Sequence, residues 1–155
     1  MTEINPEAIS IAAAMDAERS KGIIRSPLHG IPMLIKNNIA TADKMNNTAG
    51  SYALLGATVG RDAGVAAKLR ASGVILLGKA NLSQWSSFRS TNSSSGWSAL
   101  GGQVAGAYYP HMNPGGSSSG SAVSSSIGLA VISLGKETSG SIIIVSVSIY
   151  YHQKI

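Results

Sequence analysis

The sequence predicts an α/β fold, in which helices cover a sheet, and three features carry this prediction. Residues 5–22 begin with Asn-Pro and then place apolar residues at helical spacing. The run "IPMLI" contains a proline and reads as a buried strand that ends at Lys36. Residues 61–73 are again helical in period, with Gly73 as the expected stop, and "VILLGKAN" follows as a second buried strand. Helix, tight glycine turn and apolar strand in this order indicate a layered domain.

Weaker patterns extend this prediction toward the C-terminus. Residues 81–90 are expected to form a short helix, "SAVSSSIGLA" a helix packed through small residues, and "AVISLGKE" a strand. The stretch "SIIIVSVSIYY" is uncharged and strongly β-prone, and it predicts a C-terminal strand that invites aggregation if nothing covers it. No repeat or domain boundary interrupts the chain, so residues 1–155 are expected to form one domain.

Composition excludes several classes of function. The chain has 155 residues, of which 44% are hydrophobic and 12% charged, so it can bury a core. Its net charge is +5, but the basic residues are scattered singly and there is only one Phe, which argues against a nucleic-acid partner. Without cysteine, and with three histidines lacking ligand spacing, no metal or other cofactor is expected. Neither a signal peptide nor a membrane span is recognised, which predicts a cytoplasmic protein.

Two local motifs are weighed against simpler interpretations. "GVILLGKA" matches a phosphate-binding loop except at Ala80, where Ser or Thr would hold magnesium, and its bulky middle residues favour a plain buried strand. His29 and Asp16 could complete a hydrolase triad with one of many serines, but their spacing does not favour this over a structural histidine in a turn. Trp97, Tyr108 and Tyr109 are interpreted as packing residues.

A catalytic site without histidine is the more coherent hypothesis. A serine hydroxyl becomes a nucleophile when a nearby base takes its proton, and a lysine can be that base if burial lowers its pKa. Lys36, at the end of an apolar strand, is a candidate for such an environment. Ser141 follows Gly140 in "ETSGSI", a tight turn whose backbone N–H groups could hold an oxyanion. Alone, each residue is more simply an ordinary lysine or turn serine.

The order of several blocks resembles the amidase signature family, whose members use a Ser-cisSer-Lys triad. The blocks include "PLHGIPMLIKNNI", "VAAKLRASGVILLGKANLSQWSSFRS", "NPGGSSSGSA" and "GKETSGSI", and they extend over residues 27–142. The resemblance implies a mixed central sheet covered by helices and hydrolysis of a linear carboxamide C–N bond through a serine acyl-enzyme. It also implies a small-molecule amide as the substrate.

The resemblance assigns roles to individual residues. Lys36 corresponds to the catalytic lysine, Ser117 to the serine preceded by a cis peptide bond, and Ser141, 24 positions later, to the nucleophile. Backbone N–H groups of the turn, Ser141 among them, would form the oxyanion hole, and neighbouring residues would support the loop around Ser117. The oxyanion residues are Thr138, Ser139 and Gly140, and the loop-support residues are Gly115, Gly116 and Ser118.

Departures from the family pattern also lead to expectations. Ser119 replaces a usual glycine, Lys136 and Ser139 replace threonine and aspartate of close relatives, and Asn37 stands where many relatives have aspartate. Ser119 could strain the loop, and Lys136 adds a charge beside the nucleophile turn.

Length is the largest departure. The chain is short for the family, so residues 1–26 are interpreted as a lead-in, 27–142 as the family core of a truncated domain and 143–155 as a divergent tail. The alternative function is therefore an inactive fragment that depends on a partner or self-associates through its exposed C-terminal strand.

Overall fold

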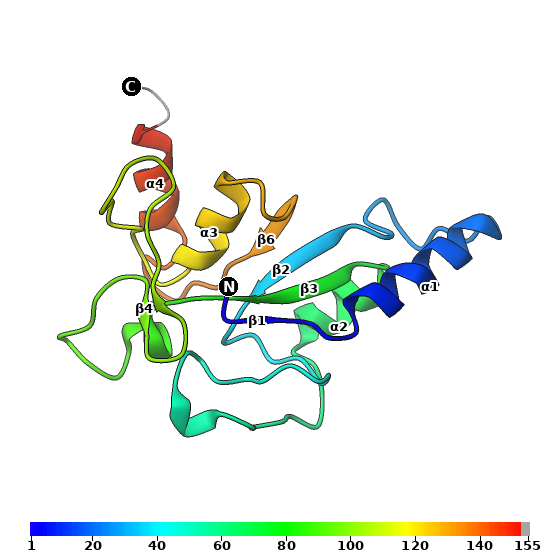
Figure 1. Ribbon diagram of the computed structural model, residues 1–155, viewed down its shortest axis with the longest axis horizontal. Coiled ribbons are helices and arrows are strands. Elements are labelled where there is room, and N and C mark those ends of the chain that lie inside the picture. Colours follow the sequence, from blue (N-terminus) through cyan, green and yellow to red (C-terminus); the bar gives the residue numbers. More distant parts are fainter. Residues whose placement is uncertain (153–155) are drawn as a thin grey trace.

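The computed structural model describes residues 1–152, and the side chains of residues 1–147. Its centre is a four-stranded sheet in the order β1-β3-β2-β6 (Figure 1). β2 (Pro32–Lys36) runs parallel to both β3 (Ile75–Ala80) and β6 (Ile132–Leu134), whereas β1 (Glu3–Ile4) is antiparallel to β3. The sheet is therefore mixed, and the α/β prediction is confirmed.

Helices cover both faces of this sheet. α1 (Ala8–Ser20) packs on β3 through Met15 and Ile75, while α2 (Gly64–Ala71) packs through Ala66 on the cluster that contains Leu76. Successive strand residues point to opposite faces, so Ile75 and Leu76 place the two helices on opposite sides. These helices and strands follow the periods that the sequence predicts.

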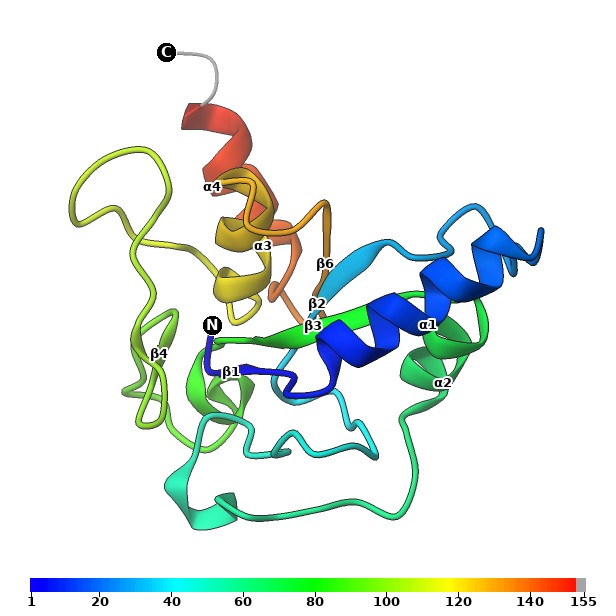
Figure 2. The ribbon, with the colours of Figure 1, turned by 45° about the vertical axis from the view of Figure 1, so that its right-hand side comes forward.

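Two further helices lie at one end of the sheet, side by side in both views (Figures 1 and 2). α3 (Ser119–Ser126) packs against β2, β3 and β6, and α4 (Ile143–His152) packs against α3. A two-stranded ribbon of β4 (Trp97–Ser98) and β5 (Gly102–Gln103) stands beside them. Two short 3₁₀ turns, Tyr52–Leu54 and Gln84–Ser87, complete the described elements, the second within the short helix predicted for residues 81–90.

The predicted C-terminal strand is wrong: residues 143–152 form α4. The preference of Ile and Val for strands depends on packing against neighbouring strands, whereas this segment packs against helix α3. The helix is started instead by Glu137, whose carboxylate accepts hydrogen bonds from the N–H groups of Ile142 and Ile143 at 2.7 and 2.9 Å. Self-association through an exposed strand therefore loses its structural basis in this segment.

The prediction that three aromatic residues are packing residues is also wrong. Trp97, Tyr108 and Tyr109 are 44%, 38% and 48% exposed, because they lie in the ribbon and loops outside the helix layers. Among the described residues, no helix combines the length and apolar character needed to cross a membrane.

Candidate active site

Three segments that are distant in the sequence meet beyond the carboxyl end of β2. Lys36 is the last residue of β2, Ser117 and Ser118 directly precede α3, and Ser141 lies just before α4. The carboxyl ends of β2, β3 and β6 lie at the same edge because these strands are parallel. Ligands of open α/β sheets bind at such an edge.

A continuous chain of hydrogen-bond contacts joins Lys36, Ser117 and Ser141. Lys36 Nζ lies 2.7 Å from Ser117 Oγ, and Ser117 Oγ lies 2.6 Å from Ser141 Oγ. All three side chains are buried, with Lys36 fully inaccessible to solvent. Hydroxyl protons rotate to suit their partners, so the same positions allow proton transfer in either direction. The structure thus brings together the residues that the resemblance marks as catalytic.

The ammonium group of Lys36 contacts hydroxyl and carbonyl oxygens and no carboxylate among the described residues. Its Nζ donates to Ser118 Oγ at 2.9 Å and to the carbonyl of Lys136 at 2.9 Å. Burial, and to a lesser extent the nearby charge of Lys136, lower the pKa of Lys36 to about 8, although Glu137 acts in the opposite direction. About a tenth of such a lysine is neutral at pH 7, and this neutral form can accept a proton.

Ser118, predicted only to support the loop, contacts the candidate base directly. Besides accepting from Lys36, its Oγ donates to the carbonyl of Lys136 at 2.9 Å, and its N–H donates to the carbonyl of Ser141 at 3.0 Å. No sequence signal separates Ser118 from the serines around it. Its role depends on the way that the two loops approach each other.

Two glycines permit that approach. A Cβ on Gly116 would lie 2.5 Å from the carbonyl oxygen of Gly140, and a Cβ on Gly115 would lie 2.9 Å from Val145 Cα. Gly115 also has a φ of +80°, which L residues with a side chain rarely adopt. Both glycines are therefore packed closely against the segment that carries Ser141.

The peptide bond before Ser117 differs from the expected cis form. The described residues contain no cis peptide bond, so the Gly116–Ser117 bond is trans, the ordinary form for a bond that does not precede proline. Ser117 nevertheless reaches both Lys36 and Ser141.

The turn formed by residues 137–141 offers fewer free N–H donors than expected. The N–H of Gly140, predicted to bind an oxyanion, donates to Glu137 Oε1 at 2.6 Å. Within the described part of the chain, the N–H groups of Thr138, Ser139 and Ser141 donate to no protein acceptor. The turn places the Glu137 carboxylate within hydrogen-bond reach of three N–H groups, those of Gly140, Ile142 and Ile143, so the donor of Gly140 is occupied. Three N–H groups remain that could face an oxyanion.

Glu137 should therefore stabilise the turn in a pH-dependent way. The N–H groups of Ile143, Ile142 and Gly140 hold the pKa of its carboxyl below its ordinary value of 4.5, against the opposing effect of burial. Because the folded state lowers this pKa, the stabilisation is present above about pH 4.5 and is lost as the pH falls below it. We expect Glu137→Gln to lower the melting temperature at pH 7, with the difference shrinking in acid. Glu7→Gln, which removes one partner of an exposed ion pair, is the control. If Glu137→Gln lowered the melting temperature equally at pH 7 and in acid, the stabilising role of the Glu137 carboxylate would be contradicted.

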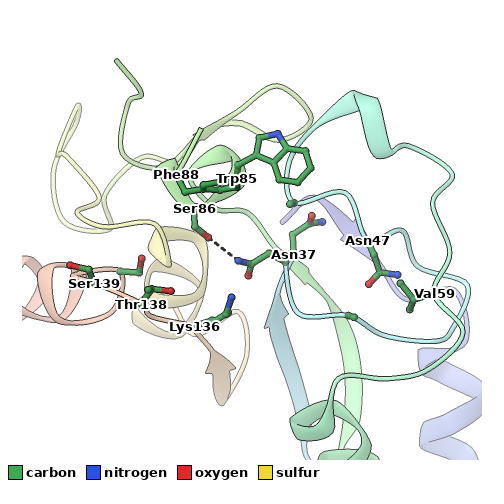
Figure 3. A pocket seen from close by; sticks show the side chains of 13 residues that line it. Asn37, Asn47, Val59, Trp85, Ser86, Phe88, Lys136, Thr138 and Ser139 are labelled. Atoms are coloured by element: carbon green, nitrogen blue, oxygen red, sulfur yellow. Dashed lines mark hydrogen bonds between the residues drawn. The ribbon is translucent and has the colours of Figure 1, made fainter. Parts of the chain in front are cut away.

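A pocket of about 730 Å³ opens beside Ser141 (Figure 3). Its lining combines the aromatic rings of Trp85 and Phe88 with the amide of Asn47 and the ammonium of Lys136. The dashed line in Figure 3 joins Ser86 Oγ to its donor, Asn38 Nδ2, at 2.8 Å. The pocket also reaches Thr138 and Ser139, so the residues of the turn that keep free N–H groups border the same space as Ser141.

The departures at Ser119 and Asn37 have different structural outcomes. Ser119 Oγ is buried without a hydrogen-bond partner, beside Gly96. Asn37 is satisfied: its Oδ1 accepts from Thr48 Oγ1 at 2.8 Å and from the N–H of Gly50 at 3.1 Å. Neither residue contacts Lys36, Ser117 or Ser141 through a hydrogen bond.

His29 is structural, as the simpler interpretation predicts. It is 1% exposed, and its Nε2 lies 3.0 Å from the carbonyl oxygen of Met15. It lies on the α1 side of the sheet, away from the serines. The phosphate-loop motif is likewise a buried strand, β3. No cluster of metal-ligating side chains occurs among residues that the structure describes.

Comparisons with known proteins identify the family. The family model described as Amidase matches residues 1–144, and the chain therefore belongs to the amidase signature family. A protein of Arthroderma benhamiae named "Putative amidase" is 59% identical over 143 residues, which are 92% of this chain and 24% of that protein. A probable amidase of Arabidopsis thaliana is 52% identical over 143 residues, 91% of this chain and 28% of that protein.

Solved structures agree with this assignment. The native peptide amidase of Stenotrophomonas maltophilia superposes with a TM-score of 0.88 at 48% identity, over 92% of this chain and 29% of that one. The chain thus has the amidase signature fold and spans about a quarter of the length of the curated relatives that it matches.

Proposed function

We propose that this chain carries the catalytic centre of an amidase that hydrolyses the C–N bond of a linear carboxamide through a serine acyl-enzyme. Lys36 is the base, Ser117 the relay and Ser141 the nucleophile. The observation that carries the proposal is the unbroken contact chain from Lys36 Nζ to Ser141 Oγ, with distances of 2.7 and 2.6 Å. Membership of the amidase family supports the type of bond that is cleaved.

The proposed reaction begins with neutral Lys36. Lys36 takes the proton of Ser117 as Ser117 takes that of Ser141, and Ser141 Oγ forms a bond to the amide carbon. The tetrahedral oxyanion is held by the N–H groups of Thr138, Ser139 and Ser141. Gly140 is omitted from this set because its N–H is bound to Glu137.

The second half of the reaction returns the proton. Protonated Lys36 passes it through Ser117 to the departing nitrogen as the C–N bond breaks, which leaves an ester on Ser141. Water then attacks this ester while the same relay removes its proton, and the carboxylic acid is released with Ser141 restored.

Trapping the acyl-enzyme tests the proposal. With hexanamide as substrate and hydroxylamine as competing nucleophile, we expect hexanohydroxamate as a product alongside hexanoate. Ser117→Ala should abolish both products, because it breaks the relay. Lys68→Met, a substitution on the exposed face of α2, should leave both unchanged. Hydroxamate formation that survives in the Ser117 variant would contradict the proposed relay.

The pH dependence of acylation is a second expected result. Because only neutral Lys36 can accept a proton, the rate should rise with pH through about 8, the pKa of Lys36. Lys136→Met removes a repelling positive charge, so the midpoint should move to higher pH. Initial rates between roughly pH 6.5 and 9.5 measure both midpoints, and a profile that is flat over this range would contradict the assignment of the base.

The inactive-fragment alternative is favoured by one observation. β6 is an edge strand, and apolar side chains that directly precede it are exposed, with Val131 at 75% and Leu129 at 43%. Such surface tends to associate. This alternative predicts an apparent mass that grows with concentration in size-exclusion chromatography with light scattering. A constant monomer with cooperative unfolding would count against it.

A further inference from the structure

Lys136 places a positive charge at the wall of the pocket beside Ser141. Its side chain is exposed and lines the pocket, extending in Figure 3 into the opening near Thr138. Lys136 comes two residues after Leu134, the last residue of β6, so the sheet fixes the place of its backbone.

The backbone of Lys136 is held against the catalytic residues. Its carbonyl accepts hydrogen bonds from Lys36 Nζ and Ser118 Oγ, both at 2.9 Å, and its N–H donates to Ser118 Oγ at 3.2 Å. The backbone from which the Lys136 side chain extends is therefore fixed in place. The ammonium group lies no farther from this backbone than the length of a lysine side chain.

No carboxylate of the described residues neutralises this ammonium group. Lys136 takes part in none of the ion pairs of the described chain, and no Asp or Glu lines the pocket. The adjacent carboxylate, that of Glu137, is occupied by the N–H groups of Gly140, Ile142 and Ile143. The pocket thus contains one positive charge and no negative one.

Apolar surface completes the recognition chemistry. The apolar part of the lining comes from Trp85, Phe88, Val59 and Ala49. A ligand that suits this lining has an apolar stretch against the rings, an amide at Ser141 and an anionic group within reach of Lys136. A positively charged ligand would meet repulsion from Lys136.

We propose that the pocket selects amides that carry a carboxylate, the half-amides of dicarboxylic acids being the simplest members of this class, and that Lys136 binds the carboxylate. This inference rests on the proposed function for the position of the amide. It makes Lys136 a specificity-determining residue.

Equilibrium binding tests the inference without requiring turnover. In the Ser141→Ala chain, ¹⁵N–¹H spectra are titrated with succinamate and with 4-oxopentanamide, in which a methyl ketone replaces the carboxylate. Glutaramate and 5-oxohexanamide form a second, longer pair. We expect the carboxylate member of at least one pair to bind about fivefold more tightly, as for a partly exposed ion pair. The preference should shrink as salt rises from about 0.05 to 0.5 M.

Variants assign the preference to Lys136. Lys136→Met and Lys136→Gln should bring the two members of the pair to equal affinity, whereas Lys68→Met, with the same change in net charge, should keep the preference. Equal binding of both members to the parent chain, no binding of either, or a preference that survives both Lys136 variants would overturn the inference.

The outcomes separate this inference from the proposed function. If the carboxylate preference depends on Lys136 but the parent chain forms no hydroxamate, the binding site is supported and the catalytic proposal is contradicted. Hydroxamate formation with no carboxylate preference would do the reverse. The salt dependence on the Ser141→Ala chain needs no substitution at Lys136, so the test holds even if those variants fail to fold.

Discussion

Replacing Lys36 by methionine is expected to lower the rate of acylation of Ser141 by about 10²- to 10⁴-fold, the usual contribution of a positioned base. Methionine keeps most of the side-chain length but has no group that accepts the proton of Ser117. The expected loss appears in the rate of hydroxamate formation at pH 8. Because Lys36 Nζ also donates to three oxygen atoms, the variant must first be shown to be folded by its amide spectrum.

A second buried lysine provides the matched control for this prediction. Lys79 is fully buried like Lys36, and burial likewise lowers its pKa to about 8. Its Nζ donates to the carbonyl of Ile39 at 2.8 Å and to Asn47 Oδ1 at 3.2 Å, and to no serine. A folded Lys79→Met chain should retain acylation within about tenfold, whereas equal losses in both variants would show that the effect is general to buried lysines.

Gly120→Ala is expected to produce the largest loss of stability, about 3 kcal/mol of the free energy of unfolding, in the upper range for overpacking. A Cβ at this position would lie 2.2 Å from the carbonyl oxygen of Asn81 and 2.7 Å from its nitrogen. These are backbone atoms, and Asn81 is further anchored because its side chain donates to the carbonyl of Gly102 and accepts from Ser98 Oγ. Helix α3 would have to move away from β3 and would draw Ser117 with it.

Denaturant unfolding measures this effect against Gly64→Ala. A Cβ on Gly64 meets nothing within 4 Å, and this residue begins α2, so the control should be neutral or stabilising by up to about 1 kcal/mol. A Gly120 variant as stable as this control would show that α3 does not pack against Asn81 as closely as described.

Local patterns predicted the first half of the fold because period and burial agree there. Residues 8–20 and 64–71 are helices, and the apolar runs ending at Lys36 and Ala80 are buried strands. The C-terminal segment could not be predicted in this way. Its Ile and Val residues favour strands on average, but the Glu137 carboxylate starts a helix, and this helix packs on α3.

For the candidate site too, local patterns predicted one part and tertiary contacts decide the rest. A lysine at the end of an apolar strand describes Lys79 as well as Lys36, and both are buried in the fold. The two lysines differ in tertiary contacts that a local pattern does not contain, because only Lys36 is approached by the serine loops. The family resemblance singled out Lys36, and its assignment as the base stays a prediction until it is tested.

Two details of the site depend on contacts that no motif specifies. The N–H of Gly140 is bound to Glu137, a result of where the carboxylate folds back onto the turn. The direct contact of Ser118 with Lys36 depends on the close approach of the loops at Gly116. Both contacts follow from tertiary packing, and the local order of glycines and serines in the sequence does not specify them.

Intact-mass analysis after treatment with a serine-directed fluorophosphonate tests the central claim most directly, namely that Lys36 and Ser117 activate Ser141. We expect a single adduct on the parent chain that maps to Ser141, is absent from Ser141→Ala and forms at least about a hundredfold more slowly in Lys36→Met. A folded parent chain that forms no adduct, or an adduct that forms equally fast without Lys36, would contradict this claim.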